Sequence, residues 1–142
     1  MDIKPKNVLK EGLQNIRPLL EKNGFKQSKI TGGSSSGGHF ATVGFSNGNV
    51  EIGLIVRANG YLGCPNYSAG HGYASHEKLL SVLGCDEDSS LVPGKWLSYI
   101  SRTDSNPFTA LFDDLSNLIL PRFRKSRSEF EEAINRAHKE TF

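Results

Sequence analysis

The sequence has little of what marks the specialised classes of protein. No apolar run approaches the roughly 20 residues of a transmembrane helix, and the first residues lack the apolar core of a secretory signal. Only two cysteines occur, Cys64 and Cys85, which is too few for a disulfide framework. We therefore expect a cytoplasmic protein without membrane association, in which both cysteines are reduced thiols.

An excess of one charge is also missing. Lys and Arg number 17 against 15 Asp and Glu, a net charge of +2. This balance is not that of a dedicated nucleic-acid binder, so we do not expect nucleic acid as the partner. The chain has 142 residues, 37% hydrophobic and 23% charged, which is typical of a globular protein. We expect one α+β domain over residues 1–142.

Two segments carry apolar residues at helical spacing. The first stripe comprises Leu9, Leu13, Ile16 and Leu20. It predicts a helix over residues 5–23, bent near 14–18 because Pro18 cannot donate a backbone hydrogen bond. The second begins at the capping pair Asn106-Pro107 and keeps one apolar face to Ala137, which favours one long helix kinked at Pro121.

Alternating apolar and polar residues predict strands between these helices. The expected strands span residues 40–46, 50–57 and 61–67, with Asn-Gly turns between them. Pro65 places the third strand at a sheet edge or ends it early. Residues 95–100, with Trp96 as a core anchor, are a possible fourth strand. The fold class is therefore α+β, a three- or four-stranded antiparallel meander covered by an N-terminal helix and a long kinked C-terminal helix.

Two shorter segments flank the predicted meander. Residues 32–38, which contain only Gly and Ser, are typical of a flexible connection. They are not a phosphate-binding loop, because they lead into a strand and not into a helix. Ser75 is a suitable N-cap for a short helix over residues 76–83.

The histidines are the first candidates for chemistry. His71 and His76, with Cys64 nearby, suggest a metal site or a Cys/His nucleophilic pair. The segment that starts at His76 resembles the zinc-protease helix motif, but Leu80 stands where the second histidine is required. We therefore favour His76 as a residue that caps or packs its helix and His71 as a loop residue. The sequence predicts no catalytic residue, metal site or cofactor.

Charged residues form three small groups. The neighbouring acids at 113–114 and 131–132 point in different directions on a helix, so we expect them on its solvated side. A basic cluster comprises Arg122, Arg124, Lys125 and Arg127. A solvated face is the default for it, and a merged basic surface with the lysines of the N-terminal helix is the alternative.

The order of these features resembles a known type of protein. The landmarks are residues 20–25, which end in Gly24-Phe25, then Phe40-Ala41, 51–57, 61–63, 75–77 and 112–115. They resemble small bacterial domains of unknown function built on a helix, a Gly-Phe turn, a β-meander and C-terminal helices. Several such families are associated with polymorphic-toxin loci as immunity proteins. The resemblance implies a non-enzymatic module that binds a protein, and in particular an immunity protein that binds and neutralises a bacterial toxin domain.

The expected contact surface is the segment 61–76, because Tyr is favoured at interface hot spots. Its candidate protein-binding residues are Tyr61, Asn66, Tyr67, His71, Tyr73 and His76. The sheet edge near Pro65 and a charged helix face are the ways in which it would recognise a partner. The alternative is a small-ligand or metal-binding domain, or a minor hydrolase, that uses the loop of His71 and His76.

Overall fold

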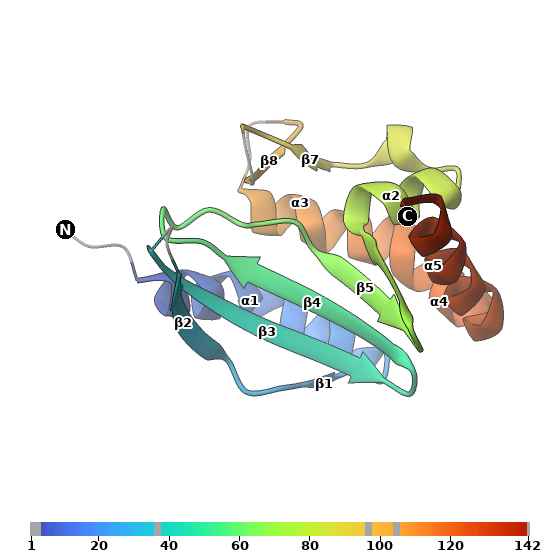
Figure 1. Cartoon of the computed structure of the whole chain (residues 1–142), viewed down its shortest axis with the longest axis horizontal. Coiled ribbons are helices and arrows are strands. Elements are labelled where there is room, and N and C mark those ends of the chain that lie inside the picture. Colours follow the sequence, from blue (N-terminus) through green and yellow to red (C-terminus); the bar gives the residue numbers. More distant parts are fainter. Residues whose placement is uncertain (1–3, 36–37, 96–97, 104–105, 142) are drawn as a thin grey trace.

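An antiparallel sheet with helices against one face forms the molecule, which confirms the α+β class (Figure 1). The computed structural model describes residues 4–35, 38–95, 98–103 and 106–141. The helices are α1 (Pro5–Lys22), α2 (His76–Val82), α3 (Pro107–Asp114), α4 (Leu120–Lys125) and α5 (Arg127–Thr141), with a 3-10 turn η1 (Asp86–Asp88) and a π-helical segment η2 (Leu115–Ile119).

The main sheet has more strands than the three or four expected. Its strands are β1 (Lys26–Gln27), β2 (Thr31–Ser35), β3 (Gly38–Asn47), β4 (Val50–Val56), β5 (Asn66–Ala69) and β6 (Gly72–Ser75). The order is β1-β3-β4-β5-β6, and β2 also pairs with β3. A separate hairpin pairs β7 (Leu91–Pro93) with β8 (Tyr99–Ser101), so the segment 95–100 does not extend the meander. Trp96 lies outside the described residues.

The predicted hairpin between β3 and β4 is confirmed, and the third strand is displaced. Gly48 has a φ of 61° in the first turn, a conformation that glycine adopts without strain. Pro65 delays the next strand, because β5 begins only after it, and Leu62 forms a single bridge to Val56. Since β5 lies between β4 and β6, the predicted open sheet edge near Pro65 is wrong.

The expectation of a flexible Gly/Ser connection is also wrong where the structure describes it. Thr31–Ser35 forms strand β2, which pairs with β3 from Thr42 to Gly38. A Cβ at Gly33 would lie 2.7 Å from the Phe40 ring, so the missing side chain makes room for that ring. The Thr31 and Thr42 hydroxyls, 2.8 Å apart, add a cross-strand hydrogen bond.

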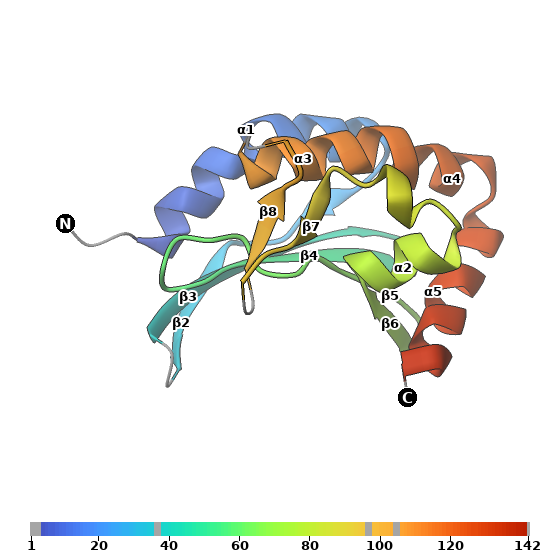
Figure 2. The same ribbon diagram turned by 90° about the horizontal axis from the view of Figure 1, so that it is seen from above.

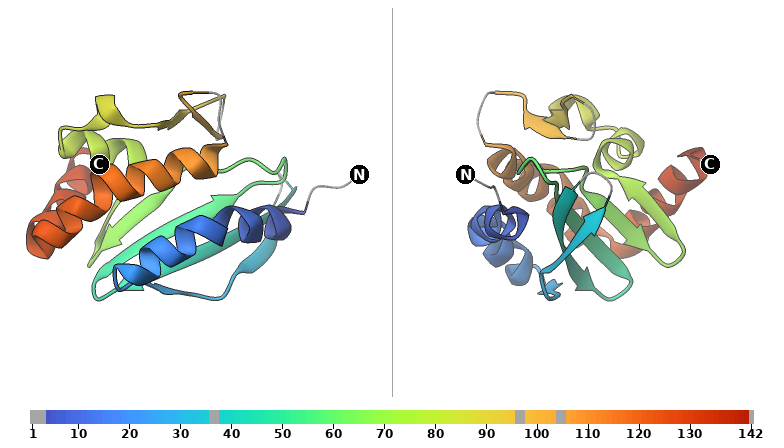
Figure 3. Two further views of the ribbon diagram at one scale, coloured as in Figure 1. Left: turned by 180° about the vertical axis from the view of Figure 1, so that it is seen from behind. Right: turned by 60° about the vertical axis from the view of Figure 1, so that its left-hand side comes forward.

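Helix α1 covers the sheet as its apolar stripe predicts. It continues through Pro18 to Lys22, and its buried stripe packs against β3 and β4. The C-terminal helices lie beside it, and Figures 2 and 3 show α1 and α3–α4 running across the same face. Together these helices shield the apolar side of the central strands.

The C-terminal helical segment bends at a different residue from the one expected. The chain stays helical past Pro121, because the π-helical segment η2 accommodates the backbone around the missing N–H. It breaks at Ser126, whose backbone is extended (φ −158°, ψ 106°). From there α5 runs off in another direction and packs against β5 and β6 (Figure 2). A long helical run across Pro121 is therefore confirmed over residues 107–125, and α5 follows it as a separate helix at an angle.

Candidate functional site

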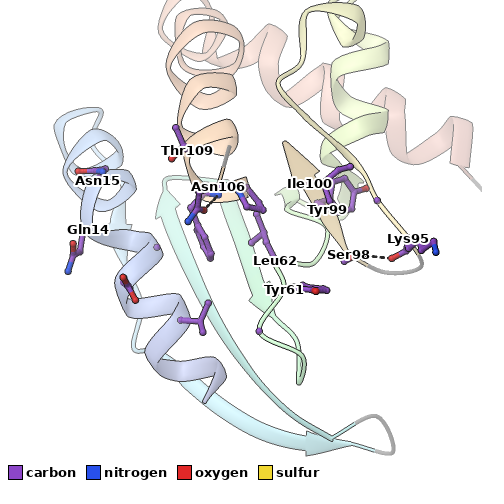
Figure 4. Close-up of a pocket in the computed structure, with 17 residues that line it drawn as sticks. Gln14, Asn15, Tyr61, Leu62, Lys95, Ser98, Tyr99, Ile100, Asn106 and Thr109 are labelled. Carbon is purple, nitrogen blue, oxygen red and sulfur yellow. Dashed lines mark hydrogen bonds between the residues drawn. The ribbon is translucent and has the colours of Figure 1, made fainter. Parts of the chain in front are cut away.

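A cleft of about 810 Å³ is lined by residues from both halves of the chain (Figure 4). Its walls are α1, the turn at residues 60–62, the β7–β8 hairpin and the first turn of α3. These segments are far apart in the sequence, so the cleft exists only in the folded chain.

Two contacts join neighbouring walls, and an N-cap begins the α3 wall. A Cβ at Gly12 of α1 would overlap the ring of Phe108 in α3, so glycine lets the two helices approach closely. The backbone N–H of Tyr99 donates to the carbonyl of Leu62 over 2.9 Å, which fixes the hairpin to the 60–62 turn. Asn106 caps α3, because its Oδ1 accepts from the Phe108 N–H at 2.8 Å. The described walls are therefore built before any ligand binds.

Two large apolar side chains of the cleft are open to solvent. Tyr61 is 58% exposed and Ile100 is 50% exposed, and both line the cleft. The described residues contain one other exposed large hydrophobic side chain, Tyr73. Apolar groups that protrude around a concave surface are typical of binding sites.

The described lining of the cleft combines apolar side chains with groups that form hydrogen bonds. It holds a single carboxylate, Glu11, and a single lysine, Lys95, with no histidine or cysteine among its described residues. Its other polar groups are mainly amides and hydroxyls, on Gln14, Asn15, Ser98, Asn106 and Thr109. This mixture suits recognition of a polypeptide surface.

The hydroxyl group of Tyr99 has a structural role in the wall of the cleft. Its hydroxyl donates to Cys64 Sγ at 3.1 Å. Burial raises the pKa of Tyr99 well above its usual value, and the hydrogen bond to Cys64 raises it further. The phenol therefore stays protonated and serves to hold the hairpin on the 60–65 segment.

The structure does not gather the six predicted contact residues on one surface. Tyr61 lies at the cleft. Asn66 is exposed at the start of β5, and His71 is exposed in the turn before β6. Tyr73 is exposed on β6, where its ring packs edge-on against His138 of α5 at 4.9 Å.

The prediction that Tyr67 and His76 contact a partner is wrong. Tyr67 and His76 are both 0% exposed, so neither presents its side chain to a partner. Tyr67 Oη lies 2.7 Å from His76 Nδ1, and His76 Nε2 lies 2.8 Å from Asp114 Oδ2. This chain of contacts joins β5, α2 and α3 inside the core.

Asp114 is the central acceptor of this buried network, and its expected place on a solvated helix face is wrong. It is 1% exposed and accepts from the backbone N–H of Ser90 at 2.7 Å. Ser89 Oγ lies 2.6 Å from Asp114 Oδ2. Burial alone raises the pKa of Asp114, but the hydrogen bonds from His76, Ser89 and Ser90 outweigh it and lower the pKa below its ordinary value.

The spacing of apolar residues around Asp114 indicates that its side chain is buried. Asp114 lies three residues after Leu111 and four before Leu118, both buried, so it occupies the apolar face of its helix. The angle between Asp113 and Asp114 on the helix does not by itself reveal this position.

The described residues hold no cluster that matches a metal site. No group of three or more His, Cys, Asp or Glu side chains converges among them. His76 uses both ring nitrogens within the core, on Tyr67 and Asp114. The proposed pairing of His71 with His76 therefore has no support in the geometry.

The basic cluster makes specific contacts and is only partly a solvated face. Arg124 donates to Asn23 Oδ1 at 2.8 Å, just beyond the end of α1. Arg127 donates to Asn47 Oδ1 at 2.8 Å and lies 5.0 Å from the centre of the Phe123 ring. Arg122 bonds the carbonyl of Leu118 within its own helix. These contacts fix the C-terminal helices to the end of α1 and to the β3–β4 turn.

No protein-family model, curated protein or solved structure matches this chain. Within the described residues, no helix is both long enough and apolar enough to cross a membrane.

Proposed function

We propose that this protein is a non-enzymatic module that binds another protein through the cleft between α1, α3 and the β7–β8 hairpin. The exposed pair Tyr61 and Ile100 carries this proposal. Tyrosine combines a large apolar surface with a hydrogen-bonding tip, which is why it is common at interface hot spots. A partner that packs an apolar side chain against these two residues buries them, and its backbone groups form hydrogen bonds with the surrounding amides.

The contacts between the described cleft walls support the same proposal. Binding costs less when the site does not have to be ordered first. The contact of Gly12 with Phe108 and the bond from Tyr99 to Leu62 both exist without a partner.

The resemblance to immunity proteins extends this proposal to a toxin domain as the partner. Both cysteines are free thiols, which fits a cytoplasmic location. Identification of the captured protein by mass spectrometry tests this extension separately from the binding itself.

A capture experiment with matched variants tests the proposal. The tagged protein, the variant Tyr61→Ser/Ile100→Ser and the control Tyr73→Ser are each exposed to a lysate of the cells that make the protein. Tyr73 is 50% exposed and lies on β6, outside the cleft lining. We expect a stoichiometric partner that the wild type and Tyr73→Ser retain and the cleft variant loses. Capture by all three forms alike, or by none, contradicts the proposal.

A further inference from the structure

A second groove, of about 670 Å³, lies on the other side of α1, between this helix and the segment 27–30 that joins β1 to β2. The left view of Figure 3 shows α1 beside this part of the chain. Its cationic lining residues are Lys6, Lys10, Arg17 and Lys29, and its described lining contains no acidic side chain. Its apolar lining residues are Leu13, Pro18 and Ile30.

Three of these cations have no acidic neighbour in the described part of the chain. No carboxylate lies within ion-pair distance of Lys6, Lys10 or Lys29 there, whereas Arg17 pairs with Glu21 at 2.6 Å. Like charges held close together repel each other, and an anion placed between them relieves that repulsion. The groove is therefore complementary to a ligand with several negative charges.

The groove also reaches an outer edge of the sheet, at Gln27 of β1. β1 and β2 each pair with β3 alone among the described strands. A strand edge offers unpaired backbone groups to another extended chain. Lysines beside the edge disfavour pairing with a strand that carries no negative charge. An extended polypeptide with carboxylates meets both conditions.

The lining favours a polypeptide over a nucleic acid. No aromatic side chain is present among the described lining residues, so the groove offers no surface on which bases stack.

We propose that this groove binds an extended acidic segment of a polypeptide, whose carboxylates contact Lys6, Lys10 and Lys29. An aliphatic side chain of the segment packs on Pro18 and Ile30, which are not fully buried. The groove is separate from the cleft of the proposed function, and only Gln14 of α1 lines both. A test of one site therefore does not test the other.

The probe for this proposal is a fluorescein-labelled peptide in which Glu and Val alternate, followed by fluorescence anisotropy at low salt. The test variant is Lys6→Glu/Lys10→Glu. The control is Lys125→Glu/Lys139→Glu, which changes the net charge equally on exposed positions of α4 and α5. We expect the test variant to bind the peptide at least about tenfold more weakly, and the control to stay within about twofold of the wild type.

Both substitutions lie at exposed positions of α1. Lys6 is in the first turn, where an acidic residue interacts favourably with the helix dipole, and Lys10 lies one turn further on. Equal weakening in both variants would show attraction by net charge alone and overturn the proposal. So would a lack of peptide binding, or displacement of the peptide by a thymidine oligonucleotide at lower concentration. The variant Tyr61→Ser/Ile100→Ser should bind the peptide as the wild type does, which keeps this result distinct from that of the cleft.

Discussion

The imidazole of His76 and the carboxylate of Asp114 lie 2.8 Å apart, Nε2 to Oδ2, and each side chain is only 1% exposed. An ionised carboxylate only accepts hydrogen bonds, so Nε2 is the donor. The contact joins the first residue of α2 to the last residue of α3. Such a buried polar pair fixes the relative position of its helices, because any other packing leaves a charge without a partner.

Replacement of Asp114 by Asn should destabilise the fold strongly. The N–H groups of Ser90 and Leu91 bond to different oxygens of the carboxylate. The amide keeps the size of the side chain, but its NH2 group must replace one of these oxygens, so donor hydrogens then face the N–H of either Ser90 or Leu91. We expect the free energy of unfolding, measured in urea, to fall by about 3–5 kcal/mol. The neighbouring Asp113→Asn is the control and should change it by less than about 0.5 kcal/mol. Similar losses for both variants would refute the role given to Asp114.

The same carboxylate should make stability depend on acid pH. The folded pKa of Asp114 is lowered, so its contribution is fully present above the unfolded pKa of about 4 and is lost as the pH falls through the lower folded pKa. The free energy of unfolding of the wild type should therefore decrease below about pH 4. Asp114→Asn should show a shallower decrease over this range. Parallel curves for the two proteins would contradict the assignment.

Local signals made much of the fold predictable. The cap residues Ser75 and Asn106 each accept the backbone hydrogen bond expected of an N-cap, at 3.2 and 2.8 Å. The stripe of α1 and the turn at Gly48 were likewise found correctly. In each case the interaction spans a few residues, so the sequence contains both partners at a known spacing.

Contacts between distant residues account for the failures. Strand β2 forms because Phe40 packs over Gly33, and the composition of residues 32–38 carries no sign of this. The break at Ser126 lets α5 reach β5 and β6, which a continuous apolar phase does not reveal. For the cleft, Tyr61 was predicted as a contact residue, but Ile100 comes from a hairpin whose position depends on the bond from Tyr99 to Leu62.

The two thiols should differ in reactivity toward DTNB. Cys85 is 3% exposed, and burial raises the pKa of its thiol, an effect that nearby Arg122 offsets only in part. Cys64 is partly exposed. Because the thiolate is the reactive form and must be reached by the reagent, we expect a fast phase from Cys64 and a slow one limited by unfolding from Cys85. Cys64→Ser should remove the fast phase, and Cys85→Ala should preserve it.

Gly12→Ala should destabilise the protein, although alanine favours helices by about 1 kcal/mol over glycine. The new Cβ of residue 12 overlaps the Phe108 ring, including Cγ, the ring atom bonded to the Cβ of Phe108. A small rotation of the ring therefore cannot remove the overlap. We expect the free energy of unfolding to fall by about 1–3 kcal/mol, as for other overpacked cores. Gly53→Ala is the control, since a Cβ there meets nothing within 4 Å and the substitution should be neutral or slightly stabilising. If the overlap is the cause, Phe108→Leu should cost less stability in the Gly12→Ala background than in the wild type, and additive losses would contradict it.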